Sequence, residues 1–408
     1  MGILSKIKNR ISDMPTLFFP RIFYGHNDSS NGININDSNL LTINTVYSCI
    51  KVLSETIAAL PLELQNKDDK ETIKSKKHPL YKLVNLSPNK EMTSFMWRQF
   101  MMIQVLAFGN SVSQIIKNRK GEVIEIYPMD WRKMQIIRDK KDNRLLYKYN
   151  VISTVKKEYT LEQSEVIHLR MFNSESGIIG TSLTEYQKEN LGLSKLIQNF
   201  ASNFFKNGAT PTGCLEVTDN LNDKEFEKVQ KHFEEQTKGN SNSHIPLILE
   251  GGMTFKPLNM SNEESQFLET RKFERSTISS FFRVPLHFIN DLEKATFSNI
   301  EHQDLAFEKH TIRPWIINWN QELQTKLLTK EEYENGYFFY HNTDSLREGD
   351  YKSKQEALAI QRQNGVITTN EWRKKNRLDP IDGGNQLLIN GNMIPLDSKL
   401  QKEKLKNR

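Results

Sequence analysis

The chain has few of the residues that mark disulfide-rich, membrane-spanning or zinc-binding proteins. Its 408 residues include only two cysteines, Cys49 and Cys214, which are far apart and have apolar neighbours. Buried free thiols in a reducing compartment are therefore expected rather than a disulfide or a cysteine-based metal site. No apolar run approaches the length that spans a membrane, and the first ten residues lack the apolar core of a signal peptide.

Motifs of catalysis are equally scarce. There is no GxxxxGK[ST] phosphate loop, no HExxH, no paired CxxC and no GxSxG turn. Histidines are scattered, with His302 and His310 eight positions apart, and isolated histidines are poor indicators of a metal site. We therefore expect a protein that is not an enzyme and has no cofactor and no metal.

The chain also lacks a strong charge in its body. The net charge is +6, yet the first ten residues carry three basic residues and no acidic one, and the last ten carry five basic residues and one acidic residue. The residues between these ends therefore have a net charge of −1. Tight binding to nucleic acid needs a clustered basic face, which this part of the sequence does not display.

Low hydrophobicity points to a segmented protein. Hydrophobic residues make up 37% of the chain and the mean hydropathy is −0.62. Residues 1–40 are polar and predict a poorly ordered arm, with structure beginning near Leu41. Helical spacing of apolar residues predicts helices over 45–60 and 93–108, the second ending at Gly109. The expected strands alternate apolar and polar residues, and they lie at 62–64, 111–117, 123–127, 134–139, 145–149 and 166–170. The fold class expected from this pattern is α+β with antiparallel strands.

Two long helices enclose a small insert in the middle of the chain. A capping-box pattern at Ser182–Glu185 opens a helix that we expect to continue to Gly208, and a second one at Ser261–Glu264 opens a helix to Phe282. Between them we expect a small βαβ-like unit. Its predicted helix is 222–237, with Phe226, Val229 and Phe233 facing inward, and its predicted strands are 212–218, 245–249 and 253–258.

A mostly polar loop and a long amphipathic helix follow Val284–Pro285. The helix, capped by Ser298 or Asn299, contains Pro314, where it should bend unless a new helix begins there. Its apolar residues share one face, namely Leu305, Ile312, Trp315, Ile316, Trp319, Leu323 and Leu327. Loops of this length inside a domain are usually functional, although a plain surface loop between two packed helices is the other interpretation.

Short motifs in a fixed order give the sequence its strongest resemblance. They are Val46–Ile50, Leu60–Leu62, His78–Leu80, Pro88–Asn89, Met92–Thr93, Phe108–Asn110, Ile167–His168, Gly180–Leu183, Phe205–Ala209, Val284–Pro285, Phe297–Asn299, Pro314, and Gly365–Gly384 with Thr369–Glu371, Arg373, Pro380 and Gly383. In this order the chain resembles the HK97-type portal proteins of tailed bacteriophages over nearly all of residues 41–390.

The resemblance implies a portal fold, with an α/β wing, a two-helix stem, a small α/β clip, a tunnel loop and a helical crown. The implied segments are a flexible arm (1–40), wing (41–182), first stem helix (183–208), clip (209–261), second stem helix (262–283), tunnel loop (284–299), wing helix and return (300–350), crown (351–382) and basic tail (383–408). Residues implied to be structural are Gly208, Pro285, Asn299 and Pro314.

The resemblance also implies a function and partners. Identical subunits, typically twelve, would form a ring at one capsid vertex, through which double-stranded DNA is packaged and later ejected. The implied partners are the terminase large subunit, a head-completion or adaptor protein, and the major capsid and scaffold proteins, with no membrane. The protein would be assembled in the bacterial host cytoplasm and would remain in the virion.

Two groups of residues are candidates for contact with partners. The tunnel-loop candidates for DNA contact are Asn290, Leu292, Lys294, Thr296 and Phe297. With Lys294 balanced by Asp291 and Glu293, we expect this loop to limit the channel by size and apolar side chains more than by charge. The clip candidates for partner docking are Lys224, Lys228, Lys231 and Glu235, although mixed charges are also common on an ordinary solvated helix.

A different class of function stays open at this point. The basic ends could clasp nucleic acid in an oligomeric protein that is not a portal. Salt-sensitive DNA binding that is lost on trimming residues 1–10 and 399–408 would indicate that function.

Overall fold

We analysed a computed structural model of the chain. It describes residues 35–36, 38–67, 72–151, 157–173, 177–206, 213–216, 222–237, 254–257, 261–293, 297–343, 351–376 and 378–388. Two compact units divide the chain, residues 1–341 and residues 342–408. The boundary thus lies nine residues before the predicted end of the wing at residue 350.

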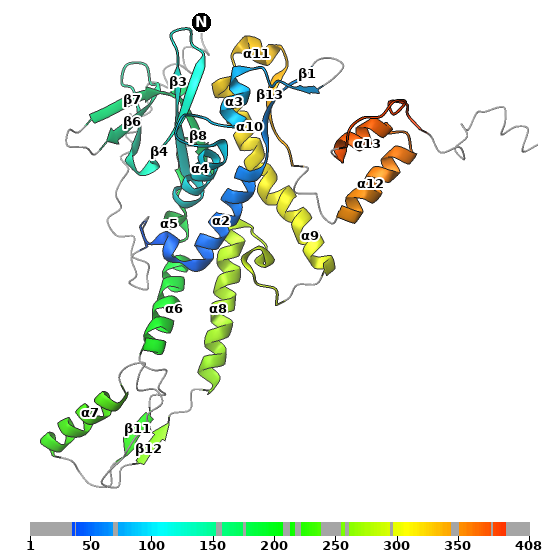
Figure 1. Cartoon of the computed structure of the whole chain (residues 1–408). Helices are drawn as coiled ribbons and strands as arrows, with labels where there is room; N and C mark the ends of the chain where they lie inside the picture. Colours follow the sequence, from blue (N-terminus) through cyan, green and yellow to red (C-terminus); the bar gives the residue numbers. More distant parts are fainter. Residues whose placement is uncertain are drawn as a thin grey trace, which may run out of the picture. The chain divides into compact units, whose positions relative to one another are not determined.

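Helices and sheets alternate through the first unit (Figure 1). Its first half contains η1 (Leu40–Thr42), α2 (Asn44–Ala59), β1 (Leu62–Lys67), β2 (Thr72–Lys74), α3 (Pro79–Asn85), α4 (Ser94–Phe108), β3 (Asn110–Lys117), β4 (Val123–Met129), η2 (Trp131–Lys133), β5 (Met134–Arg138), β6 (Leu145–Val151), β7 (Lys157–Glu162), η3 (Gln163–Glu165), β8 (Val166–Arg170), β9 (Phe172–Asn173) and β10 (Gly180–Thr181). Then come α5 (Leu183–Tyr186), α6 (Lys188–Lys206), β11 (Gly213–Glu216), α7 (Asp223–Thr237), β12 (Thr254–Pro257), α8 (Ser261–Phe282), η4 (Leu286–Ile289), α9 (Phe297–Phe307), the π-helical segment η5 (Glu308–Ile312), α10 (Arg313–Leu327), α11 (Lys330–Glu334) and β13 (Tyr337–His341). The second unit contains α12 (Tyr351–Gln363) and α13 (Thr369–Lys375).

The described strands form small antiparallel sheets, ordered β13-β1-β2, β4-β3-β8 and β5-β6-β7, with the pairs β10-β9 and β11-β12. This confirms the mixed helix and sheet class and its antiparallel strands. β13 pairs with β1 in the register Leu62 to His341, so after α10 the chain returns to the sheet that β1 began. Pairing between segments so distant in sequence could not be predicted from local alternation.

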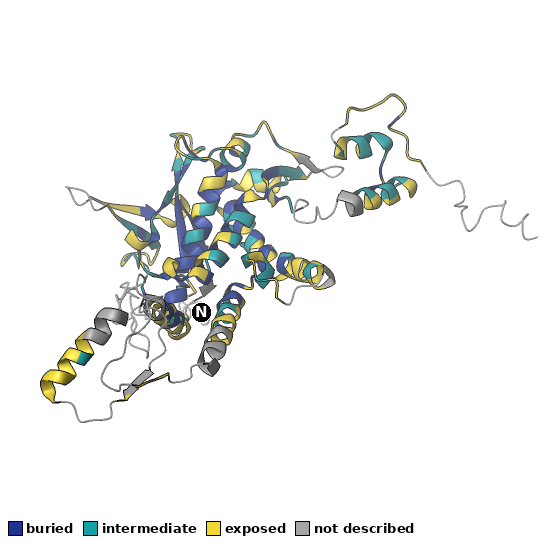
Figure 2. Cartoon of the chain, turned by 60° about the horizontal axis from the view of Figure 1, so that its bottom comes forward, coloured by how far each residue is buried: buried dark blue, intermediate teal, exposed yellow. Residues whose placement is uncertain are grey.

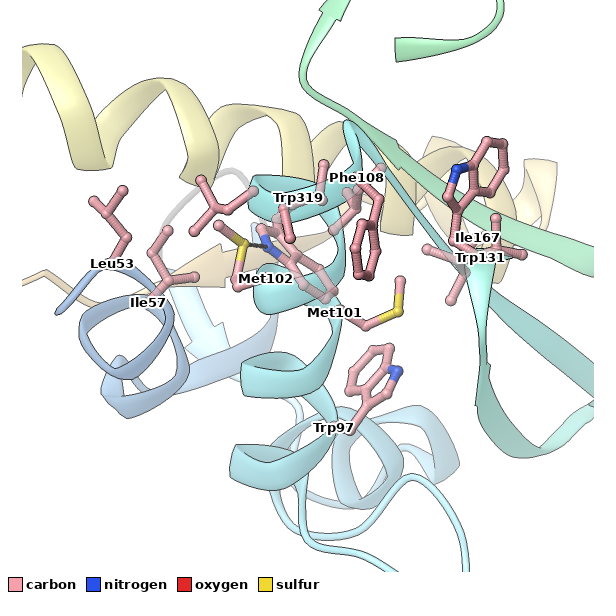
Figure 3. Packing of buried hydrophobic residues seen from close by; sticks show 14 of the residues in the cluster. Leu53, Ile57, Trp97, Met101, Met102, Phe108, Trp131, Ile167 and Trp319 are labelled. Atoms are coloured by element: carbon pink, nitrogen blue, oxygen red, sulfur yellow. Dashed lines mark hydrogen bonds between the residues drawn. The ribbon is translucent and has the colours of Figure 1, made fainter. Parts of the chain in front are cut away.

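The core lies between α2, α4 and α10, which pack on one another and on β3 and β8 (Figure 3). Trp97 and Trp319 meet edge to face with ring centroids 5.4 Å apart. Their indole N–H groups donate to Ser113 Oγ at 2.9 Å and Met102 Sδ at 3.1 Å, so both large rings are buried without losing a hydrogen bond. Beside them the guanidinium of Arg98 donates to the carbonyl of Leu60 at 2.5 Å, and burial lowers the pKa of Arg98 to about 10.

Local signals predicted the first helices well. α2 and α4 begin and end within one residue of their predicted bounds, and Gly109 closes α4 in the left-handed conformation with φ +75°. The arm was predicted too long, because Ile35 and Leu40 are fully buried in the core. The predicted arm at 1–34 and the end of the predicted tail, 389–408, lie outside the described residues.

The helix predicted over residues 183–208 as the first stem helix is not continuous. Ser182 Oγ accepts from the N–H of Glu185 as predicted, but α5 ends at Tyr186 and α6 starts at Lys188 after a break at Gln187. α6 and α8 contact each other (Figure 1). Gly208, predicted as a structural residue at the end of this helix, lies outside the described residues.

The insert also differs from its prediction. β11 and β12 pair antiparallel, so the two described strands do not form a βαβ unit, and the predicted strand 245–249 lies outside the described residues. Phe226 of α7 is exposed rather than inward-facing, as are most described residues of that helix (Figure 2).

The predicted long helix is interrupted. It begins at Phe297, so Ser298 and Asn299 lie inside its first turn and do not cap it. The π-helical turn at Glu308–Ile312 then shifts the helical register, because its hydrogen bonds span five residues instead of four. As a result Leu305 is 60% exposed, whereas Ile312, Ile316, Trp319, Leu323 and Leu327 are buried as predicted. Pro314 lies in the first turn of α10, where its missing N–H is tolerated.

Candidate functional site: the loop between α8 and α9

The loop between α8 and α9 begins with a sharp change of direction. Arg283 has φ +52°, and the following Val284 is buried and accepts a hydrogen bond from Ser279 Oγ through its carbonyl. Pro285 precedes η4, a turn that the sequence did not predict. Asn290 ends this turn with φ +61°, a conformation that asparagine tolerates better than most residues. The described part of the loop is therefore a folded structure.

Ion pairs hold the loop against α8. Arg275 Nη1 lies 2.8 Å from Asp291 Oδ2, and Lys272 Nζ lies 2.5 Å from Glu293 Oε1. The hydrogen bond and charge of Glu293 raise the pKa of Lys272. Asp291 is mostly buried, with 14% of its side chain exposed, whereas the Lys272 pair is open to solvent. Both acids thus have partners on α8, whereas Lys294, which they were predicted to balance, lies outside the described residues.

The other side of the loop is attached to α9. The ring nitrogens of His287 lie 3.0 Å from Gln303 Oε1 and 2.8 Å from Asp304 Oδ1. Phe288 packs on Phe307 with ring centroids 4.7 Å apart. The loop thus bridges two helices, and a movement of either helix would pull on it.

Arg283 connects the end of α8 to the π-helical turn. Its carbonyl accepts from Thr311 Oγ1 at 2.8 Å, and its guanidinium donates to the carbonyl of His310 at 3.4 Å. In an α-helix the carbonyl of His310 would accept from the N–H four residues later, but that residue is Pro314. The side chain of Arg283 therefore replaces a hydrogen bond that proline cannot make.

The predicted tunnel-loop residues fall into two groups. Asn290 and Leu292 are described, both exposed, with Leu292 directly after the buried Asp291. Lys294 and Thr296 lie outside the described residues, and Phe297 is described only as the first residue of α9. Of the residues predicted to be structural, Pro285 precedes η4 and Pro314 lies in the first turn of α10, close in sequence to the two segments that Arg283 connects. Asn299 is an exposed residue of the first turn of α9.

Sequence reasoning missed Lys272, Arg275 and His287. The sequence does contain a signal for the ion pairs, because two basic residues lie three positions apart on α8 and two acidic residues lie two positions apart in the loop. Nothing local to either segment joins them, because the loop must fold back before the pairs can form.

Three of the short motifs meet immediately before α5, at a place that we call the wing joint because it ends the predicted wing. His168 is fully buried, and its Nδ1 accepts from Arg170 Nε at 3.3 Å and from Tyr147 Oη at 3.1 Å. Its other nitrogen, Nε2–H, therefore donates to Asn110 Oδ1 at 3.1 Å. Burial, with added repulsion from Arg170 and Lys326, holds the pKa of His168 well below its usual value, which agrees with a neutral ring.

Asn110 then joins this histidine to the β9–β10 hairpin. Its Oδ1 accepts from the N–H of Gly180 at 2.7 Å and its Nδ2 donates to the carbonyl of Gly180 at 2.6 Å. A Cβ on Gly109 would lie 2.3 Å from the carbonyl oxygen of Thr181, so only glycine allows this approach. The motifs at 108–110, 167–168 and 180–183 are thus one structural unit.

The predicted docking helix of the insert is only partly described. Lys224, Lys228 and Lys231 are exposed on α7, and their spacing places them along one face. The side chain of Glu235 lies outside the described residues. Glu225 is used to cap the helix, since its carboxylate accepts from the N–H of Asn222 and its own N–H donates to Asn222 Oδ1.

The two cysteines differ in how far the structure describes them. Cys49 is a buried free thiol, as predicted, and burial raises its pKa to about 12. The side chain of Cys214 lies outside the described residues. Within the described part of the chain, no group of three or more metal-binding side chains gathers and no helix is long and apolar enough to cross a bilayer.

Comparison with known proteins identifies the class. The family model for the phage portal protein matches residues 44–376, so the chain belongs to the phage portal protein family. The portal protein of Enterobacteria phage HK97 is 29% identical over 369 residues, which cover 89% of this chain and 85% of that protein. The role of the chain is accordingly that of a phage head portal, as the resemblance predicted.

Solved structures share the fold. A chain from the neck of a native gene transfer agent particle, computed with C12 symmetry, has a TM-score of 0.56 at 18% identity and covers 85% of this chain and 94% of its own. The crystal structure of an HK97-family phage portal protein from Corynebacterium diphtheriae has a TM-score of 0.55 at 15% identity and covers 77% and 97% of the two chains.

Proposed function

We propose that twelve copies of this chain form a closed ring at one capsid vertex and that double-stranded DNA passes through its centre. Membership of the portal family carries this proposal. The exposed apolar side chains of the stem support it, since Leu193 and Leu196 of α6 are each 42% exposed and Phe273 of α8 is 74% exposed in the single subunit. Residues of this kind normally become buried against a partner surface.

The loop between α8 and α9 is the segment that we propose to lie closest to DNA. Its described acids are paired with α8, so they would not repel phosphates strongly, and its exposed described residues include Leu292. A conduit needs weak contact with DNA, because each neutralised phosphate makes release harder. We therefore infer that size and apolar side chains set the constriction. If Lys294→Ala alone stopped packaging while shortening the loop did not, charge would be the controlling feature instead.

The insert between α6 and α8 is the segment that we propose to dock the terminase large subunit during packaging and a head-completion or adaptor protein afterwards. The exposed lysines 224, 228 and 231 on α7 support this, because they remain available on one face. Reversing their charge should weaken docking of the motor in a pull-down with purified terminase. Docking at unchanged strength would mean that this face is only solvated.

The remaining assignments concern the particle. We propose that residues 351–382 form the crown inside the capsid, that the wing meets the major capsid and scaffold proteins, and that the ring is assembled in the host cytoplasm and stays in the virion. We also propose that the chain has no enzymatic activity of its own, the energy for DNA movement being supplied by the motor.

Native mass spectrometry combined with electron microscopy of the purified chain tests the central proposal. A closed ring of about twelve subunits with a central hole is expected. A monomer that stays monomeric when mixed with scaffold protein would contradict it, and salt-sensitive DNA binding by that monomer would favour the alternative in which the basic ends clasp nucleic acid.

A further inference from the structure

A groove of about 950 Å³ opens on the predicted wing, and no described residue of the loop between α8 and α9 lines it. Four stretches line it: the turn between β3 and β4, the start of α3, the strands β6 and β7 at their ends, and the end of α10 with the start of α11. A volume of this size can take several side chains of a peptide or a small ligand.

Three lysines line this groove without an ion pair to any described residue. Lys117, Lys120 and Lys326 line it, and among the described residues no carboxylate forms an ion pair with any of them. Lys326 Nζ donates instead to the carbonyl of Gln163 at 2.6 Å. Burial lowers the pKa of Lys326, and the charges of Arg170 and Lys117 lower it further against the opposing effect of Glu322.

The acids that line the groove already have partners. Glu122 accepts from Asn118 Nδ2 at 2.6 Å, and Glu162 pairs with Arg144 at 3.2 Å. Glu332 accepts from the N–H of Thr329 at 2.7 Å and lies 2.9 Å from His78 Nε2. Only Glu162 among these acids pairs with a guanidinium, so the three lysines exceed the two remaining carboxylates, Glu122 and Glu332, by one positive charge.

Apolar side chains form the rest of its lining. They include Leu80 of α3, Val123 and Ile124 of β4, Leu145 and Leu146 of β6, and Leu327 of α10. Ile124 is 46% exposed at the rim. An occupant that matches both parts must offer a negative charge beside an apolar side chain.

We propose that this groove binds an extended segment of another protein chain in which aspartate or glutamate alternates with apolar residues. The half-buried Lys326 and the apolar wall favour such a peptide over nucleic acid, because a phosphate backbone supplies charge but no apolar side chain to cover the wall. This proposal does not depend on ring formation.

Fluorescence anisotropy of labelled peptides with the full-length chain tests the proposal. The probe is a short acetylated peptide of alternating aspartate and leucine, and its matched control has asparagine in place of aspartate. We expect the aspartate peptide to bind at least about tenfold more tightly than the control. Lys117→Gln and Lys326→Gln should each weaken it about tenfold, and Ile124→Ser should weaken both peptides.

Lys140→Gln is the matched control variant, because it removes an exposed lysine on the neighbouring β5–β6 turn that does not line the groove. It should leave peptide binding unchanged. Equal binding of the two peptides, no binding at all, or equal weakening by Lys140→Gln would overturn the proposal. Displacement of the peptide by duplex DNA with equal losses in all three lysine variants would identify a general polyanion surface instead. Self-association that Lys117→Gln abolishes would identify a second copy of the chain as the occupant.

Discussion

The predicted wing and the predicted stem of this subunit differ in how far their side chains are buried and hydrogen-bonded within one chain. At the wing joint the buried polar groups of Asn110 and His168 find partners within the same chain, and the tryptophans of the core are buried with their N–H groups bonded. On α6 and α8, Leu196 and Phe273 remain exposed, and one of the two ion pairs that attach the loop to α8, Lys272–Glu293, is open to water. The polar groups of Asn110 and His168 are thus paired within one subunit, whereas α6 and α8 have apolar surfaces suited to a partner. Four substitutions test this contrast, in order of their expected effect on the stability of one subunit.

The largest loss of subunit stability is expected from Gly109→Ala. The new Cβ would lie 2.3 Å from Thr181 O and 2.8 Å from Ser182 N, both backbone atoms, at a residue with φ +75°. Relief of this clash would separate β10 from α4 and break the bonds of Asn110, so we expect a loss of about 3 kcal/mol or more. Urea unfolding followed by tryptophan fluorescence measures it.

Gly121→Ala is the matched control, since Gly121 has φ +83° but nothing within 4 Å of an added Cβ. Its cost should be limited to the backbone conformation, about 1 kcal/mol. Equal losses in the two variants would mean that the close approach at the wing joint is unimportant.

The second largest effect is a dependence of the free energy of unfolding on pH, caused by the buried His341. Burial, with repulsion from Arg98, lowers its pKa from 6.5 to about 3. The unfolded chain takes up a proton below pH 6.5 and the folded chain does not until about pH 3, so stability is full above this window and falls as the pH drops through it. Between pH 8 and pH 5 this group should cost about 2 kcal/mol.

His341→Asn should remove that part of the pH dependence, because the amide can still donate to Asn320 Oδ1 in place of the ring Nδ1–H. Urea midpoints at pH 8 and pH 5 measure the difference, and the exposed His302→Asn serves as the control. A wild-type loss that His341→Asn leaves unchanged would assign the acid sensitivity to other groups, such as His168.

The fold and the candidate site could be predicted from the sequence only where local patterns determine the structure. Helices α2 and α4, with the glycine cap at 109, follow from local spacing and were predicted within one residue. The pairing of β1 with β13, the meeting of Asn110 with Gly180, and the ion pairs between α8 and the loop depend on contacts between distant segments. The break at Gln187 and the π-helical turn at 308–312 were missed, because each preserves an apolar spacing that resembles a continuous helix.

A smaller effect is expected where the loop meets α8. Asp291→Asn leaves Arg275 without its carboxylate, and we expect the loop to open more easily by about 1 kcal/mol. Hydrogen exchange of the amides at 286–293 should accelerate accordingly, while exchange in α4 stays unchanged. Glu293→Gln should have less effect than Asp291→Asn, because the Lys272 pair is exposed and screened by salt. Equal acceleration in the two variants would show that burial of Asp291 contributes nothing to holding the loop.

The smallest effect on the subunit, and the sharpest test of the contrast, is expected from Leu196→Asp on α6. Leu196 is 42% exposed, so the free subunit loses little packing and its urea midpoint should change by no more than about 0.5 kcal/mol. If the stem surface is buried between copies, the new carboxylate is placed in that interface and ring formation should fail in native mass spectrometry. Asn199→Asp adds the same charge to the same helix at an exposed polar residue, without removing an apolar side chain. A ring that forms normally from Leu196→Asp, or fails equally in Asn199→Asp, would mean that this apolar surface is not what joins the subunits.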